Sequence, residues 1–215
     1  MSLATQLAAA QEGLNQNVPA PIVEAINKSR SDLAAAFDEG AVIKPGATLP
    51  SFTLPDAHGN EVTSKSLLAE GPILITFYRG DWCPFCNLAL RDLQKHHAEF
   101  QAKGVTLVAI SPQLPDGSLS MTEKHDLSFV VLSDVGNKFA RQLGIVHKQP
   151  ETLRPMFELS KMDFTKINGD ESLELPIPAT FLVDGHGKVR KAYAETDFMK
   201  RLGSAGALKW VDEEF

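Results

Sequence analysis

Residues 73–86 decide the fold of this chain, and they read Ile73-Leu74-Ile75-Thr76-Phe77-Tyr78-Arg79-Gly80-Asp81-Trp82-Cys83-Pro84-Phe85-Cys86. The first six residues are a nearly continuous apolar run, which is typical of a central strand buried on both faces. Both cysteines of the chain follow it, three residues apart, where an amphipathic stretch begins. The segment therefore predicts a buried strand, a loop and a helix that starts at the cysteine pair.

The spacing of Cys83 and Cys86 predicts a reversible disulfide. Residues three apart on a first helical turn face the same side, with Cβ atoms roughly 5–6 Å apart, so a small adjustment brings two sulfurs into bonding range. If Cys83 is the N-cap and Pro84 the first helical residue, the missing N–H of proline costs nothing. The free N–H groups of that turn would favour a Cys83 thiolate, and Cys86 could attack whatever forms on it.

Two other interpretations of the cysteine pair are an inert core pair and half of a zinc site. Zinc needs about four ligands. The chain has no third cysteine, and its six histidines are not spaced as partners to the pair. We therefore expect redox chemistry, with neither a metal nor another cofactor.

Length, composition and charge exclude several classes of protein. A chain of 215 residues with 43% hydrophobic content fills one core plus an appendage. Its net charge of -6, without a basic cluster, predicts neither a nucleic-acid nor a membrane partner. Residues 1–27 contain no Lys or Arg, which argues against a secretory or transit leader. We expect a cytoplasmic protein, where a C-x-x-C pair is more plausibly catalytic than a permanent brace.

The chain divides near Pro45-Gly46-Ala47, which marks a boundary between a helical N-terminal extension over 1–43 and a domain over 44–215. The extension carries apolar residues at helical intervals over 3–16 and 20–39, and it could pack on its own core or on a second subunit. A homodimer is therefore one possible assembly.

Strands and helices alternate through the domain, which indicates a parallel layer with crossovers. We expect a hairpin over 52–63, strands at 73–78, 105–110 and 129–132, a late hairpin over 180–193, and helices at 84–102, about 119–127, 138–143 and 196–202. The stretch 148–176 is read as an insertion with a short helix at 151–161 and a turn at Asn168-Gly169, and it is a candidate wall of the site.

Three further positions are candidates for supporting the cysteines. Pro178, at the start of the late hairpin, is a candidate cis peptide next to backbone that could bind an extended substrate, although a trans strand-entry proline is the alternative. Arg79 could support a thiolate or a peroxide oxygen, or form a solvated salt bridge. Trp82 could shield one side of a sulfur, or simply pack.

From about residue 44 to 203, the chain resembles the thioredoxin superfamily, and within it the peroxiredoxin-like proteins of the alkyl hydroperoxide reductase and thiol-specific antioxidant family. The resemblance is carried by Gly46-x-x-Leu49-Pro50-x-Phe52-Thr53-Leu54, by Phe77-Tyr78 and by Thr180-Phe181-Leu182-Val183-Asp184. It implies an α/β thioredoxin-like fold with a central mixed sheet flanked by helices.

The family signature Pro-x-x-x-Thr-x-x-Cys places the peroxidatic cysteine at Cys86. This chain has Cys83 at the threonine position and Arg79 at the proline position, and Pro178-Ala179 stand where the family's arginine is expected. The resemblance to thioredoxin, by contrast, matches its Cys-x-x-Cys motif to Cys83 and Cys86 and its cis-proline to Pro178. It implies that Cys83 is the nucleophile. The attacking cysteine therefore remains open between the two.

The resemblance implies an antioxidant oxidoreductase. The first hypothesis is a thiol-dependent peroxidase that acts on hydrogen peroxide or organic hydroperoxides and is recycled by a thioredoxin- or glutaredoxin-type donor. The second is a thioredoxin-like oxidoreductase that acts on protein or small-thiol disulfides. Catalysis would rest on Cys83 and Cys86, with support from Arg79, Trp82, Pro84 and Pro178.

Overall fold

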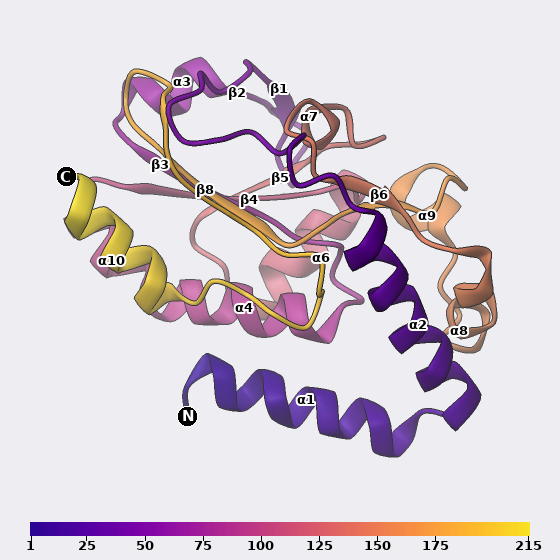
Figure 1. The fold of residues 1–215 in the computed structure, drawn as a ribbon. Coiled ribbons are helices and arrows are strands. Elements are labelled where there is room, and N and C mark those ends of the chain that lie inside the picture. The colour runs from indigo at the N-terminus through magenta and orange to yellow at the C-terminus, as the bar shows by residue number, and fades with distance from the viewer.

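A five-stranded mixed sheet organises the computed structural model, which describes residues 1–215 (Figure 1). The spatial order is β5 (Val130–Ser133), β4 (Thr106–Ser111), β3 (Ile73–Phe77), β8 (Ala179–Val183) and β9 (Val189–Ala194). Strand β3 runs parallel to β4 and antiparallel to β8, with Ile75 opposite Val108 and Phe181. The predicted thioredoxin-like mixed sheet is therefore confirmed, with β3 at its centre.

The apolar run of β3 supplies both faces of the sheet. Leu74 packs in one hydrophobic cluster, whereas Ile73, Ile75 and Phe77 pack in the other, as the two-residue period of a strand requires. All four are at most 2% exposed. The continuous run, instead of a polar alternation, follows from burial on both sides.

Helices cover the two faces unequally. One face is covered by α4 (Pro84–Lys95), α5 (His97–Ala102), α6 (Pro115–His125) and α10 (Ser204–Glu214). The other is covered by α3 (Ser64–Ala69), α7 (Lys138–Gln142) and the hairpin of β1 (Thr53–Pro55) and β2 (Glu61–Thr63). None of the helices combines the length and the apolar character that crossing a membrane would demand.

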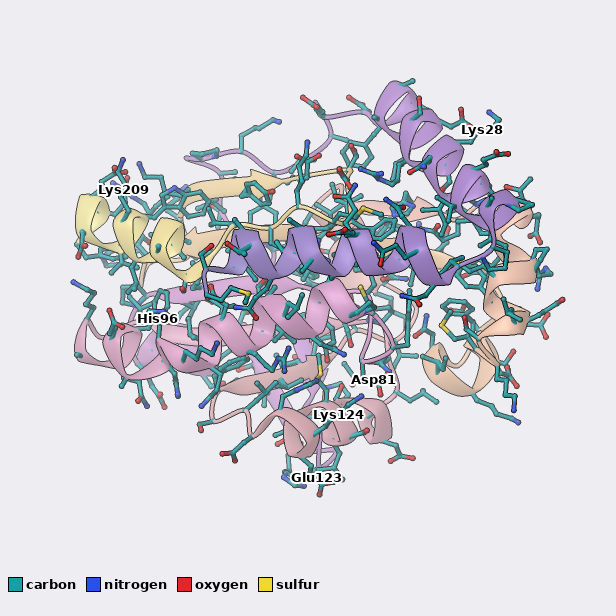
Figure 2. All side chains as sticks on the ribbon, turned by 90° about the horizontal axis from the view of Figure 1, so that it is seen from below. Lys28, Asp81, His96, Glu123, Lys124 and Lys209 are labelled. Carbon is teal, nitrogen blue, oxygen red and sulfur yellow. The ribbon has the colours of Figure 1, made fainter.

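The N-terminal extension packs on this chain's own core. Helix α1 (Leu3–Asn17) lies along α4, and α2 (Ala20–Ala36) continues toward the insertion (Figure 2). Leu3, Leu7 and Ile26 are buried in the same cluster as the cysteines. The apolar residues that the sequence places at helical intervals in α1 and α2 therefore pack against the core of the same chain.

The insertion is held by a short pair of antiparallel strands, β6 (Val146–Lys148) and β7 (Glu174–Pro176). Between them lie η1 (Glu151–Leu153), α8 (Arg154–Leu159) and α9 (Phe164–Asn168). The helix predicted over 151–161 is shorter, because Lys161 adopts a left-handed φ of 54° and ends it. The turn predicted at Asn168-Gly169 is present as the left-handed C-cap of α9.

Two helix predictions are wrong in part. The helix expected over 84–102 is broken at His96, which leaves helical geometry with φ -106° and ψ 8°. The helix expected over 196–202 is absent, and the last helix begins at Ser204. Asp197 accepts a hydrogen bond from the Met199 N–H (3.0 Å), and such local side-chain bonds compete with helix formation.

Candidate active site

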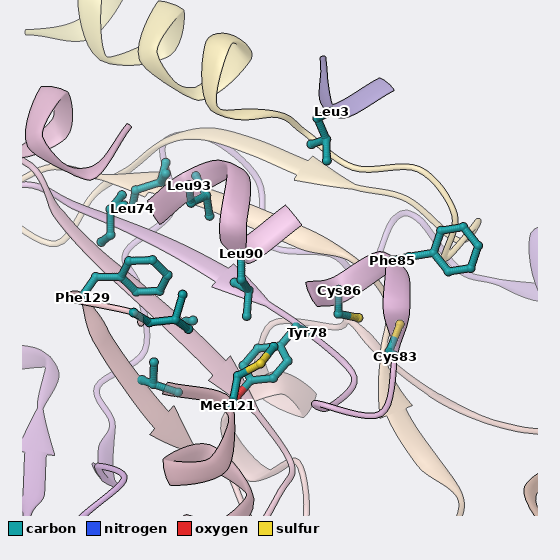
Figure 3. Close-up of a cluster of buried hydrophobic side chains, with 14 of the residues drawn as sticks. Leu3, Leu74, Tyr78, Cys83, Phe85, Cys86, Leu90, Leu93, Met121 and Phe129 are labelled. Carbon is teal, nitrogen blue, oxygen red and sulfur yellow. The ribbon is translucent and has the colours of Figure 1, made fainter. Parts of the chain in front are cut away.

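The cysteine pair sits where the sequence places it, at the start of α4. Cys83 is the N-cap and Pro84 the first helical residue, with its ring exposed to solvent. The Asn87 N–H donates to the Cys83 carbonyl (3.0 Å), which closes the first turn. Both cysteines are reduced and buried, and their side chains lie within the cluster drawn in Figure 3.

Each sulfur has its own guanidinium partner. Arg79 Nη2 donates to Cys83 Sγ over 3.3 Å, and Arg201 Nη2 donates to Cys86 Sγ over 3.2 Å. Arg79 comes from the loop after β3, four residues before Cys83, whereas Arg201 comes from the segment between β9 and α10. Both sulfurs are fully buried, and electrostatic interactions with a buried group are strong because little water screens them.

The two cysteines differ in acidity. Burial raises the pKa of Cys83 well above the ordinary value, its hydrogen bond with Cys86 raises it further, and the charge of Arg79 offsets only part of this. Burial also acts to raise the pKa of Cys86, but hydrogen bonding with Cys83 and the charges of Arg201 and Arg79 outweigh it and hold that pKa well below the ordinary value.

The helix N-terminus favours a thiolate on Cys83, whereas the electrostatics around the two sulfurs favour one on Cys86. The N-cap position leaves the Cys83 side chain without a hydrogen bond to the helix backbone. Burial acts on both sulfurs alike, so the hydrogen bond between them and the charges of Arg201 and Arg79 are what favour a thiolate on Cys86, one turn further along α4.

Arg79 is fixed between two aromatic rings. Its guanidinium carbon lies 3.9 Å from the ring centre of Phe198 and 4.9 Å from that of Trp82, so cation–π contacts hold it although it is only 7% exposed. Trp82 in turn meets Phe164 of the insertion edge-on, at 5.7 Å. Trp82 thus covers Arg79, and the insertion forms part of the wall behind it.

The loop between β3 and α4 is locked by Gln113, a residue that sequence reasoning missed. The Asp81 N–H donates to Gln113 Oε1 and Gln113 Nε2 donates to Asp81 Oδ1, each over 2.7 Å. Gly80 adopts φ +148°, and a Cβ there would collide with the Trp82 indole. These contacts set the position from which Arg79 reaches Cys83.

Pro178 matches the second of its two predicted interpretations, a trans proline at the entry to a strand. The chain contains no cis peptide bond, so Pro178 enters β8 in the trans form. It is buried, its carbonyl accepts the Glu195 N–H (3.0 Å), and the neighbouring Ile177 N–H donates to the Ile145 carbonyl (2.8 Å). The Ile177 N–H and the Pro178 carbonyl are therefore used within the fold.

Arg201 was not among the predicted site residues. It lies 115 positions after Cys86 in the chain, in a stretch that the sequence suggested was helical, and no motif surrounds it. Its Nη1 group donates to the Phe198 and Lys200 carbonyls, which fixes the guanidinium against the sulfur. No group of three or more His, Cys, Asp or Glu side chains is arranged to hold a metal ion.

Comparison with known proteins identifies the family. The model of the AhpC/TSA family matches residues 45–192. The chain belongs to the AhpC/TSA family. A chloroplastic peroxiredoxin Q of Sedum lineare is 31% identical over 105 residues, 49% of this chain and 56% of that protein. A putative peroxiredoxin of Mycobacterium tuberculosis is 32% identical over 92 residues, 43% of this chain and 58% of that protein. The matched region spans about half the length of these AhpC/TSA relatives.

Solved structures show the same fold. The peroxidoxin BcpB of Mycobacterium tuberculosis superposes with a TM-score of 0.62 at 23% identity, covering 79% of this chain and 95% of that one. A peroxiredoxin Q of Xanthomonas campestris superposes with a TM-score of 0.59 at 19% identity, covering 80% and 96%. This AhpC/TSA protein therefore has the thioredoxin-like fold of the peroxiredoxins.

Proposed function

We propose that this AhpC/TSA protein is a thiol-dependent peroxidase in which Cys86 attacks the hydroperoxide and Cys83 resolves the product. The observation that carries the proposal is the contact of Arg201 with Cys86 Sγ, at 3.2 Å, on the cysteine whose pKa is lowered. The thiolate is the reactive form, so the acidic cysteine is the nucleophile. Family resemblance assigns the peroxidatic role to the same position.

The chemistry balances with these two sulfurs. The Cys86 thiolate attacks the terminal peroxide oxygen, the O–O bond breaks, and the departing alkoxide or hydroxide takes up a proton to leave as alcohol or water. Cys86 is then a sulfenic acid. The Cys83 thiol loses its proton and attacks that sulfur, so that a disulfide forms and hydroxide leaves, which becomes water on protonation. Two thiols are oxidised and one hydroperoxide is reduced.

The arginines fit this sequence of steps. Arg201 stabilises the thiolate and is positioned to stabilise negative charge on the departing oxygen, because a guanidinium carries several donors in one plane. Arg79 lies against Cys83, where it favours the thiolate that must form there in the second step. Trp82 supports Arg79, and Pro84 lets α4 begin directly after Cys83.

Recycling requires an external dithiol, and we propose a thioredoxin- or glutaredoxin-type donor in a reducing compartment such as the cytosol. Both sulfurs are fully buried, so the disulfide must become accessible by a movement of the covering segments. The division between an N-terminal extension over 1–43 and a domain over 44–215 is supported by the family match, which begins at residue 45. A homodimer is a further proposal, to be tested by solution mass.

The second candidate is thiol–disulfide exchange with another protein, which the intact Cys83-Pro84-Phe85-Cys86 sequence favours. The buried, internally bonded backbone around Pro178 disfavours it. Rapid mixing of the reduced protein with hydrogen peroxide separates the two. We expect oxidation far faster than that of a free thiol, and slow reduction of a disulfide-bonded protein substrate. Oxidation at the rate of a free thiol, together with rapid disulfide reduction, would favour the second candidate instead.

A further inference from the structure

Phe198, in the segment between β9 and α10, contacts both guanidinium groups of the site. The centre of its ring lies 3.9 Å from the guanidinium carbon of Arg79, and its carbonyl accepts a hydrogen bond from Arg201 Nη1. Arg79 is the partner of Cys83, and Arg201 is the partner of Cys86. One residue therefore connects the partners of both sulfurs.

Arg79 depends on aromatic rings for its position. It is only 7% exposed, its Nε group is buried without a hydrogen-bond partner, and no carboxylate forms a salt bridge with it. The Phe198 ring lies nearer to its guanidinium carbon than the Trp82 ring does, at 3.9 Å against 4.9 Å. A cation–π contact strengthens where water is excluded, so the Phe198 ring is a strong constraint on this guanidinium.

The Phe198 ring is itself held against the turn that carries the cysteines. It meets the ring of Phe85 edge-on, with the ring centres 5.5 Å apart, and Phe85 is only 1% exposed. Phe85 stands between Cys83 and Cys86 in the first turn of α4. The position of the Phe198 ring is therefore fixed relative to both sulfurs.

We propose that Phe198 is a positioning residue for the second step of the reaction, in which the Cys83 thiolate attacks the sulfur of the Cys86 sulfenic acid, the S–S bond forms and hydroxide leaves. Its ring keeps Arg79 against Cys83, where the positive charge favours the attacking thiolate. The inference rests on the proposed peroxidase function and assigns a residue to one of its two steps. The first step depends less on the ring, because Arg201 is held by the Phe198 carbonyl, which every substitution retains.

The groups around Cys83 define how this step should depend on pH. The titratable and charged side chains near Cys83 and its arginine partner are Arg79, Cys86, Arg201, Tyr78 and His147. Burial raises the pKa of Tyr78 to about 12. Burial lowers the pKa of His147 to about 4, and the charge of Arg79 adds to this effect. Both groups therefore stay neutral near pH 7, and the two arginines supply the charges that favour a Cys83 thiolate.

The direct test is the pKa of Cys83 in the Cys86→Ser protein, where it is the single thiol and the ultraviolet absorbance of its thiolate reports ionisation. An opposite charge close to a group shifts the pKa of that group by about 1–3 units, so Phe198→Leu should raise the pKa of Cys83 by about one unit. Phe157→Leu is the matched control, because Phe157 lies in the same hydrophobic cluster but its ring meets Phe164, at 4.8 Å, and neither guanidinium. It should shift the pKa by less than about 0.3 units. Equal shifts in the two variants would overturn the inference.

Three further variants distinguish positioning from a general loss of packing. Phe198→Met also removes the ring and should raise the pKa of Cys83 as Phe198→Leu does, whereas Phe198→Tyr keeps a ring and should leave that pKa within about 0.3 units. In an Arg79→Met background, Phe198→Leu should cause no further shift, because the ring acts through Arg79. A further shift in that background would overturn the inference.

A kinetic measurement on the protein with both cysteines separates this inference from the proposed function. After rapid mixing with hydrogen peroxide, a sulfenic-acid trapping reagent and mass spectrometry follow Cys86. Phe198→Leu should lengthen the lifetime of the sulfenic acid about tenfold at pH 7, and the rate at which it forms should stay within about threefold. Equal slowing of both steps would overturn the positioning role. Wild-type Cys86 that is oxidised no faster than a free thiol would instead overturn the proposed function, while the pKa of Cys83 in the Cys86→Ser protein would still report on Phe198.

Discussion

In the proposed mechanism, a buried Cys86 thiolate close to the guanidinium groups of Arg79 and Arg201 sets the reactivity of this protein. A free cysteine with a pKa near 8.5 is only about 3% thiolate at neutral pH, and each unit of pKa corresponds to about 1.36 kcal/mol of differential stabilisation. Arg201 and Arg79 both lower the pKa of Cys86 against the cost of burial. In the proposed mechanism, the charge balance around the two sulfurs decides which of them attacks.

Arg201→Met removes the closer charge and the hydrogen bond to Cys86 while keeping most of the side-chain volume. The pKa of Cys86 should rise, and the rate of oxidation by hydrogen peroxide at pH 7 should fall by about tenfold, because less thiolate is present. Stopped-flow oxidation across pH measures this. The lost rate should return above pH about 9, where an unassisted thiol ionises.

Arg190→Met is the matched control, since Arg190 pairs with Glu214 (2.8 Å) at the surface and touches neither sulfur. Its oxidation rate should match that of the wild type at every pH. A rate loss in Arg201→Met that no increase of pH recovers would contradict the electrostatic role and indicate a structural one.

The cysteine pair also predicts how the stability of the reduced protein depends on pH. The folded-state pKa of Cys86 is lowered, so its contribution is present above the unfolded pKa of about 8.5 and is lost as pH falls through the folded pKa. Cys83 has a raised pKa, so its contribution is present below about 8.5 and is lost as pH rises further.

The free energy of unfolding of the wild type, relative to that of Cys86→Ser, should therefore increase with pH up to about 8.5. Urea unfolding in the presence of a reductant, from mildly acidic to mildly alkaline pH, measures this difference. A difference that stays constant with pH, or that decreases toward pH about 8.5, would show that the Cys86 pKa is not lowered.

Part of the site could be predicted from sequence because its residues are neighbours in the chain. Arg79, Cys83 and Cys86 share one strand-to-helix junction, so spacing alone brings them together. Arg201 could not be predicted in this way, because only the packing of the segment before α10 against α4 brings it to Cys86. The acidity of the pair likewise depends on burial and on this distant charge.

The loop between β3 and α4 is the element that aims Arg79. Gly80 has a positive φ and packs against Trp82, whereas Gly136 has a similar sign of φ (+77°) with open space around it. Both Gly→Ala substitutions strain the backbone, by about 1–3 kcal/mol. Gly80→Ala should cost about 1–3 kcal/mol more than Gly136→Ala, because the added methyl group collides with the indole ring.

Urea unfolding of the two glycine variants measures that difference. Equal losses of unfolding free energy would show that the contact between Gly80 and Trp82 is not tight. A change in m-value for Gly80→Ala alone would indicate an altered native or denatured state instead of local overpacking.

The strands and helices were predicted correctly where the sequence carries a clear apolar pattern, either a continuous apolar run or apolar residues at helical intervals. The strands at 73–77 and 179–183 and the N-terminal helices were readable from their patterns. The stretch 196–202 was predicted to be helical. In the structure, Asp197 and Arg201 form hydrogen bonds with nearby backbone groups, and these bonds compete with a helix. The spacing of apolar residues gives no information about such bonds. The sequence also left the geometry at Pro178 open, since nothing in a sequence specifies a cis or trans bond.

At the scale of the whole molecule, the N-terminal extension is tied to the segment that carries Arg201. Arg30 of α2 makes two hydrogen bonds to Asp197, 167 positions away, and both side chains are less than a quarter exposed. Burial acts to raise the pKa of Asp197, but the bond to Arg30 and its charge outweigh it and lower that pKa. The ion pair of Arg30 with Asp197 thus ties α2 to the segment that carries Arg201, the residue that contacts Cys86.

Arg30→Gln should destabilise the protein by about 1–2 kcal/mol, between the values for exposed and buried ion pairs. Lys28→Gln, on the same helix, breaks an exposed pair with Asp32 and should cost less than about 0.5 kcal/mol. Thermal unfolding at neutral pH measures both. The difference should shrink as pH falls through the lowered pKa of Asp197, because the carboxylate is then protonated. Equal losses of unfolding free energy in the two variants would contradict a stabilising role of the Arg30–Asp197 pair.

The identity of the attacking sulfur is tested most directly by mass spectrometry of the Cys83→Ser and Cys86→Ser proteins, each treated briefly with hydrogen peroxide and a sulfenic-acid trapping reagent. The account predicts rapid trapping on Cys86 in the Cys83→Ser protein and none on Cys83 in the Cys86→Ser protein. Trapping on Cys83 alone would contradict it and make the helix N-cap, not the cysteine beside Arg201, the site of attack.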